Sequence, residues 1–148
     1  MKLTQYTDYC LRVFMYLGAS DSGRATIREI SEHYAISRHH VMKVVYELGQ
    51  KGYLHNERGK GGGIRMAVEP AHINLGMLIR DIEPDMALAE CFGEANQCCL
   101  TPVCVLRKAL HEALEAFLEV LGGYTVADLV APRTQLRIQL GMEGIRIQ

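Results

Sequence analysis

The sequence has little that an exported or membrane-spanning protein would need. It contains no tryptophan, only three phenylalanines and four prolines in 148 residues. Residues 1–8 are polar and lack the apolar segment of a secretory signal. No apolar run approaches the roughly 18 residues that a membrane span requires. These absences predict a cytoplasmic protein that does not enter a membrane.

Sequence signatures of catalysis are also missing. The chain has neither a nucleophile elbow nor a phosphate-binding loop, and His111-Glu112 lacks the second histidine of a zinc-protease motif. His33, His55 and His72 have no partner at metal-ligand spacing. We therefore expect no enzymatic activity. The hydrophobic content of 49% is enough for the core of one ordinary domain.

Charge is distributed unevenly along the chain. Residues 1–70 hold 10 Lys and Arg against 7 Asp and Glu, whereas residues 71–148 hold 6 against 10. The net charge of −1 hides this difference. A mildly basic first half suits a DNA-facing part that is joined to a part with another task.

Three amphipathic helices are predicted in the first fifty residues. The first covers about residues 5–17 and buries a stripe at Cys10, Val13, Phe14 and Leu17. The capping-box sequence Thr-Ile-Arg-Glu begins a second helix over 27–34, and Ser37 caps a third over 38–48. Two short helices joined by a tight turn predict a helix-turn-helix, in which the second helix reads DNA.

The third helix and the segment after it carry side chains suited to DNA. Strand-like runs at 53–57 and 63–68 flank a basic, glycine-rich turn, which predicts a β-hairpin wing. Arginine pairs with guanine, serine and histidine reach base edges or phosphates, and basic wings contact phosphates or the minor groove. The predicted contacts are Ser37, Arg38, His39, His40 and Lys43 on the helix, and Arg58, Lys60 and Arg65 on the wing. The alternative is an ordinary solvated polar face.

The rest of the chain divides into a helix, a loop and further helices. A helix over about 75–82 stops before Pro84, a helical pattern returns at 103–121, and a short helix follows at about 125–130. The periodicity after Pro132 is weak, and no element is predicted there. We expect a winged helix-turn-helix domain at 1–83, a cysteine-bearing loop at 84–102, a helical part at 103–131 and a tail at 132–148.

The longest predicted helix carries an apolar stripe along much of its length. Spacings of three and four residues relate its members, which are Val103, Leu106, Leu110, Ala113, Phe117 and Val120. The stripe could pack on its own domain, but so long a stripe in so small a chain better suits a partner subunit. We therefore predict a homodimer on palindromic double-stranded DNA. The expected fold is mainly α with a small β-hairpin wing: a winged helix-turn-helix plus a long dimerisation helix.

Four of the five cysteines lie close together, at Cys91, Cys98, Cys99 and Cys104. A reducing compartment favours metal or redox chemistry over disulfides, and thiolates suit iron–sulfur clusters or zinc. Gaps of five and six residues allow a loop to wrap a cluster, whereas zinc more often uses pairs two to four residues apart. The adjacent side chains of Cys98 and Cys99 diverge, so we expect three ligands from the loop and a fourth from elsewhere. Merely buried or reactive cysteines are the alternative.

The chain resembles the iron–sulfur winged-helix repressors of the Rrf-two type up to about residue 131. The resemblance rests on several stretches, namely residues 3–4, 7–9, 37–43, 58–65, 82–84, 100–104 and 124–130. It implies a 4Fe–4S cluster, or a 2Fe–2S cluster, on Cys91, Cys98 and Cys104, with Asp8 of the partner subunit as the fourth ligand. Within the family, the chain is most similar to members that sense nitric oxide and leave the operator on nitrosylation.

Three points remain open beside this resemblance. The same fold could sense iron–sulfur supply or redox state, and the cysteines could instead hold zinc in a structural or interaction module. Family members that regulate cluster biogenesis use a histidine three residues after the last cysteine, where this chain has Arg107, which cannot ligate. Cys99 could compete with Cys98 or replace the oxygen ligand. Asp8 could simply favour the dipole of the first helix and pair with Arg12.

Overall fold

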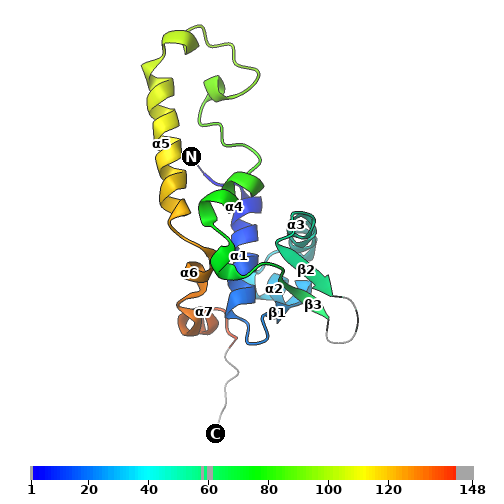
Figure 1. The fold of residues 1–148 in the computed structure, drawn as a ribbon. Coiled ribbons are helices and arrows are strands. Elements are labelled where there is room, and N and C mark those ends of the chain that lie inside the picture. The colour runs from blue at the N-terminus through cyan, green and yellow to red at the C-terminus, as the bar shows by residue number, and fades with distance from the viewer. Residues whose placement is uncertain (1, 58, 60–61, 143–148) are drawn as a thin grey trace.

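The computed structural model describes residues 2–57, 59 and 62–142. It is mainly helical with one small antiparallel sheet, which confirms the expected fold class (Figure 1). No helix in this described part is long and apolar enough to cross a membrane. The elements are α1 (Gln5–Ala19), β1 (Arg24–Ala25), α2 (Ile27–Tyr34), α3 (Arg38–Gln50), β2 (Leu54–Glu57), β3 (Gly63–Met66), η1 (Pro70–His72), α4 (Leu75–Ile82), η2 (Glu90–Phe92), η3 (Thr101–Val103), α5 (Val105–Gly122), α6 (Val126–Val130) and α7 (Arg133–Gln139).

Helix α1 lies at the centre of the winged unit, which consists of α1–α3 and β1–β3. Its N-cap residue Thr4 accepts a hydrogen bond from the Thr7 amide at 3.3 Å. The predicted stripe is confirmed as core, since Cys10, Val13, Phe14 and Leu17 are all buried. Burial of a side chain such as Phe14 contributes about 1.5–3 kcal/mol. Helices α3, α6 and α7 pack against this central helix.

Helices α2 and α3 form the predicted helix-turn-helix. The capping box of α2 is present, with Thr26 accepting from the Glu29 amide at 3.2 Å and Glu29 accepting from the Thr26 amide at 2.6 Å. Ala35 takes a left-handed conformation with φ of 52°, which allows the chain to turn sharply into α3. Ser37 caps α3, whose buried face is Val41, Val44, Val45 and Leu48.

The wing contains a strand that the sequence did not predict. Strands β2 and β3 pair as expected, with Leu54 opposite Met66, but β1 adds to the other edge in the order β1-β3-β2. A strand of two residues is too short to show alternation. Gly63 permits the close approach of β1, because a Cβ there would lie 2.9 Å from the Ala25 carbonyl oxygen. Arg58 and Lys60 lie outside the described residues.

Helix α5 projects away from the winged unit, and the cysteine loop leads to its N-terminal end. Figure 1 shows α5 projecting beyond α1, with the loop after α4 running outward alongside it to the start of α5. The helix begins at Val105 rather than at the predicted Val103, because residues 101–103 form a 3-10 turn around Pro102. Helix α4 packs on α5, and a Cβ at Gly76 would lie only 2.6 Å from the Leu118 carbonyl oxygen.

The face of α5 that packs within the chain differs from the predicted stripe. Leu114 and Leu118 are the buried residues and form a second core with Ile79. From the predicted stripe, Leu106 and Val120 are 66% and 65% exposed. The helix is apolar over more than one stripe: Leu114 and Leu118 pack on α4, whereas the predicted stripe is exposed in the single chain except at the partly buried Leu110 and at Phe117, which packs against the second core.

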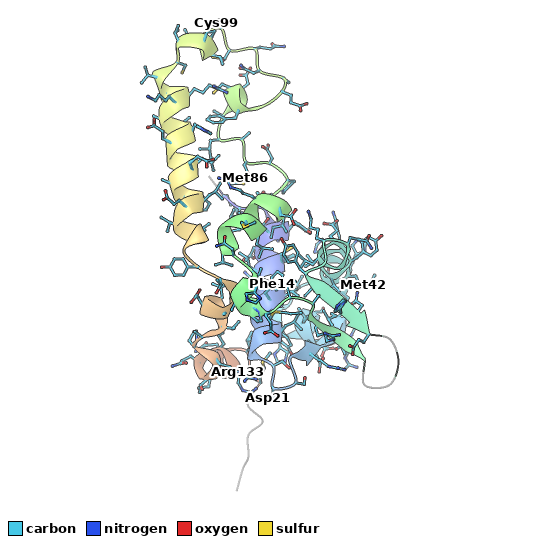
Figure 2. The ribbon with its side chains drawn as sticks, in the orientation of Figure 1. Phe14, Asp21, Met42, Met86, Cys99 and Arg133 are labelled. Carbon is cyan, nitrogen blue, oxygen red and sulfur yellow. The ribbon has the colours of Figure 1, made fainter. Side chains whose placement is uncertain are left out.

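The segment after Pro132 contains a helix where none was predicted. Arg133 of α7 donates to the Ser20 carbonyl at 2.7 Å, and Arg137 pairs with Asp21 at 2.6 Å. Figure 2 shows Arg133 and Asp21 meeting at the end of α1 opposite the cysteines. These contacts join residues more than a hundred positions apart, so local periodicity does not reveal them.

Candidate functional site

The first candidate surface is the outer face of α3. Ser37, His39 and His40 are exposed at its first turn. Arg38 pairs with Glu32 at 3.5 Å and Lys43 pairs with Glu47 at 3.9 Å. Such exposed pairs contribute about 0–1 kcal/mol. Both cations can therefore exchange their partners for DNA phosphates at little cost.

Sequence reasoning missed two side chains on this face. Met42 is 51% exposed and Tyr46 is 65% exposed, one helical turn apart. Figure 2 shows Met42 on the side of the molecule that carries the wing strands. The signal was available: the period that buries Val41, Val44 and Val45 points positions 42 and 46 outward. Exposed apolar groups on a reading helix suit contact with thymine methyl groups.

The first turn of α3 also contacts α1. The ring of His40 lies 5.9 Å from the ring of Tyr9, centre to centre. Tyr9 follows Asp8 in the chain. A predicted DNA contact and the neighbour of a predicted iron ligand therefore touch directly.

Of the three predicted wing contacts, Arg65 is the one that lies in the described residues, and it stabilises the hairpin. Its Nε donates to Glu57 Oε1 at 2.7 Å, and Arg24 pairs with the other oxygen of that carboxylate at 2.8 Å. The hydrogen bond from Arg65, with the charges of Arg24 and Arg65, lowers the pKa of Glu57. This contact ties β1, β2 and β3 together. A DNA contact by Arg65 stays a prediction, as do those by Arg58 and Lys60.

The second candidate surface is the cysteine loop, residues 84–102, together with Cys104 at the start of α5. Cys91 lies in η2, and Cys104 caps α5 by accepting from the Arg107 amide at 3.4 Å. The Cys98 amide donates to Asn96 Oδ1 at 3.0 Å. These three thiols are partly exposed, whereas Cys99 is exposed at the far end of the loop (Figure 2).

The donor set fits an iron–sulfur cluster in kind. Free thiols that can approach solvent are the ligands such clusters require. Within the described residues, no three Cys, His, Asp or Glu side chains gather around a single ion position. A zinc site needs four ligands about one point, whereas the ligands of a cluster bind separate irons and lie farther apart. A single chain therefore offers thiols that suit a cluster, but these thiols do not converge on one ion position.

Asp8 is not gathered with the cysteines in this single chain. Its carboxylate pairs with Arg12 at 2.9 Å and is about half exposed. The Arg12 guanidinium also lies 5.6 Å from the centre of the Tyr34 ring. The ion pair between Asp8 and Arg12, which the sequence offered as the alternative to ligation, is thus present. Ligation by Asp8 stays a prediction that requires a second subunit.

Cys10 stands apart from the other cysteines. Its side chain is completely buried in the core. Burial is the largest cause that raises the pKa of this thiol to about 12. Cys10 is therefore a packing residue and not a candidate ligand.

Comparisons with known proteins agree over almost the whole chain. The Rrf2 family, described as "Iron-dependent Transcriptional regulator", matches residues 3–132. The HTH-type transcriptional regulator NsrR of Geobacillus kaustophilus (strain HTA426) is 53% identical over 139 residues, 93% of this chain and 95% of that protein. The protein of the same name from Bacillus subtilis (strain 168) is 47% identical over 145 residues, 97% and 99% of the two chains.

Solved structures show the same fold at lower identity. CymR (YrzC), the global cysteine regulator of B. subtilis, has a TM-score of 0.70 at 23% identity and covers 88% of this chain and 97% of its own. T. potens IscR has a TM-score of 0.71 at 21% identity and covers 89% and 88%. The exposed reading helix, the wing and the full-length similarity lead to one conclusion: the chain belongs to the Rrf2 family of DNA-binding transcriptional regulators.

Proposed function

We propose that the protein is a homodimeric repressor that leaves a palindromic operator when nitric oxide reacts with its 4Fe–4S cluster. Cys91, Cys98 and Cys104 would hold the cluster, with Asp8 of the partner subunit as the fourth ligand. The observation that supports this most is the uncovered apolar face of α5, which directly follows Cys104. A second chain packed on that face would lie beside the cysteine loop. Similarity to NsrR proteins supports nitric oxide as the signal.

Each predicted ligand has a distinct task. The bound cluster would supply iron to which nitric oxide can bind. Three soft thiolates from one loop hold it, and a carboxylate is the harder and less suited donor. Asp8 can instead pair with Arg12, so the chain offers this carboxylate a local partner when it does not bind iron.

Contacts within the chain connect the helix that follows the cysteine loop with the end of the reading helix. Arg80 of α4 pairs with Glu115 of α5 at 2.6 Å, and the next residue, Asp81, pairs with Lys51 after α3 at 2.7 Å. Operator binding requires two reading helices about one DNA turn, roughly 34 Å, apart. Reversing the bound fraction from 1:99 to 99:1 requires only about 5.5 kcal/mol.

The test is anaerobic purification followed by nitric oxide titration, with absorption and operator binding measured on the same samples. We expect a brown protein with four irons per chain that loses operator affinity as nitric oxide is added. Two irons per chain would indicate a 2Fe–2S cluster. Cys98→Ala should prevent cluster loading and Cys99→Ala should not; the opposite result would move the ligand by one residue.

The two alternative functions give different results in the same experiment. A sensor of cluster supply or redox state would release DNA when the cluster is removed by a chelator or oxidised, and would keep its operator when nitric oxide is titrated. A structural zinc module is colourless and contains stoichiometric zinc. Either result would overturn nitric oxide sensing.

A further inference from the structure

Arg107 lies on the first turn of α5. It contacts the turn η2, which holds Cys91, and the N-cap residue of α5, Cys104. Its Nε donates to the Cys91 carbonyl oxygen at 3.1 Å. Its backbone amide donates to the Cys104 sulfur at 3.4 Å. Its guanidinium lies 5.6 Å from the centre of the Phe92 ring. A single residue thus connects η2 with the cap of α5.

The turn η2 has few other ties to the helix. It is a three-residue 3-10 turn whose N-cap, Ala89, makes no side-chain hydrogen bond. The Gln97 amide donates to Glu90, which is a bond within the loop. On α5, one turn after Arg107, His111 approaches Phe92 with a ring separation of 6.5 Å. Among the described residues, the hydrogen bond from Arg107 is therefore the one hydrogen bond that joins the Cys91 turn directly to α5.

Arginine is suited to this position by its shape and charge. The guanidinium is planar, so one edge can donate a hydrogen bond while its face approaches an aromatic ring. It keeps its charge at every relevant pH. In this place it adds one positive charge beside a loop that is expected to carry three thiolates.

We propose that Arg107 is a positioning residue for the cysteine site: it holds the Cys91 turn against the helix that Cys104 caps. The inference rests on the proposed cluster. It assigns a task to the position at which the sequence has arginine in place of a ligating histidine. It also assigns the charge a task, because a cation beside a cluster favours the more negative, reduced state and raises the reduction potential.

The test uses the full-length protein, purified anaerobically with its cluster, and three variants. Arg107→Gln removes the charge and replaces the guanidinium donor with a shorter amide. Arg107→Lys keeps the charge but loses the planar donor. Lys108→Gln is the matched control, because Lys108 is the adjacent cation on α5 and pairs only with Glu112, at 3.8 Å, among the described residues. The measurements are the rate of iron loss to a chelator and the reduction potential.

We expect Arg107→Gln to lose iron about 10-fold faster than the wild type, as is typical when a supporting contact of a metal ligand is removed. Its potential should be more negative. Arg107→Lys should also lose iron faster but keep a potential near the wild-type value, and Lys108→Gln should retain iron like the wild type. If Arg107→Gln is too unstable to purify, the iron-loss rate of Arg107→Lys decides.

Three results would overturn the inference, and they can be told apart. If the wild-type protein holds a cluster and Arg107→Gln matches it in iron loss and potential, the positioning role is wrong and the proposed function stands. The same holds if Lys108→Gln loses iron as fast as Arg107→Gln. If the reconstituted wild-type protein holds no cluster, the proposed function fails, and the role of Arg107 fails with it.

Discussion

At the residue scale, the cysteines differ in their surroundings. Cys10 packs in the core between α1 and its neighbours, whereas Cys99 is exposed at the far end of the loop. Reactivity of a thiol depends on access and on the fraction present as thiolate. Environment, rather than residue type, therefore distinguishes a packing cysteine from a reactive one.

This difference predicts selective alkylation of the protein without its cluster. At pH 8, a thiol with a pKa of about 12 is ionised to about one part in ten thousand, and Cys10 is also buried. We expect iodoacetamide to label Cys99 within minutes and Cys10 only after unfolding, as followed by peptide mass spectrometry. Rapid labelling of Cys10 in the folded protein would contradict its placement in the core.

Met42 allows a second test at the residue scale. If its exposed side chain contacts a thymine methyl, Met42→Ala should weaken operator binding by about 1 kcal/mol, about fivefold. Replacing operator thymines with uracil, one at a time, provides the control. At the contacted base, the variant and the wild type should bind the uracil operator equally. An effect of Met42→Ala that is equal on every uracil operator would show that no methyl contact exists.

At the scale of elements, α4 connects the part that bears the cysteines with the part that reads DNA. Its Gly76 lies against the backbone of α5, and its Asp81 pairs with Lys51 after α3. The ion pairs are exposed and contribute little stability. The close backbone contact at Gly76 is therefore the stronger determinant of how α4 sits on α5.

Gly76→Ala should disturb this packing. The added Cβ would lie 2.6 Å from the Leu118 carbonyl oxygen and 2.9 Å from the Gly122 amide nitrogen, so the helices must separate. We expect a loss of about 1–3 kcal/mol in the free energy of unfolding, measured with urea. Gly49→Ala is the control, because its nearest neighbour would be 3.8 Å away and alanine favours the helix by up to about 1 kcal/mol. Equal stability of the two variants would argue against the tight contact.

At the scale of the whole molecule, two features of the single chain bear on the proposed dimer. One apolar face of α5 is uncovered, and the cysteine loop presents thiols without a complete ligand set in the described residues. In the proposed dimer, a second copy of the chain would cover this face and contribute the fourth ligand. The two features lie next to each other, because α5 begins directly after Cys104.

Mixed dimers test whether the ligands come from two subunits. One chain carries Asp8→Ala and the other carries Cys91→Ala. Ligation across the dimer leaves one complete site, from the intact Asp8 of one chain and the intact cysteines of the other, so we expect half the normal cluster content by iron analysis and absorption. Ligation within each chain leaves no complete site, and heterodimers without a normal cluster would rule out the shared site.

The sequence by itself determined the features that depend on neighbours along the chain. The caps at Thr4, Thr26 and Ser37, the helical period and the glycine-rich turn are local signals, and they predicted the helix-turn-helix and its wing hairpin. Family resemblance added the proposed cluster and its ligands, which no local pattern contains. Those ligand assignments stay predictions.

Only the tertiary structure decided the features that depend on distant partners. Strand β1 forms because β3 lies beside it and pairs with it. Helix α7 is held against the end of α1 by the contacts of Arg133 and Arg137 with residues 20 and 21. Helix α5 is apolar on more than one stripe, so packing on α4, and not periodicity, selected Leu114 and Leu118 as its buried residues. The contact from Arg107 to Cys91 is of the same kind: it spans 16 residues and forms only when the loop folds back on the helix.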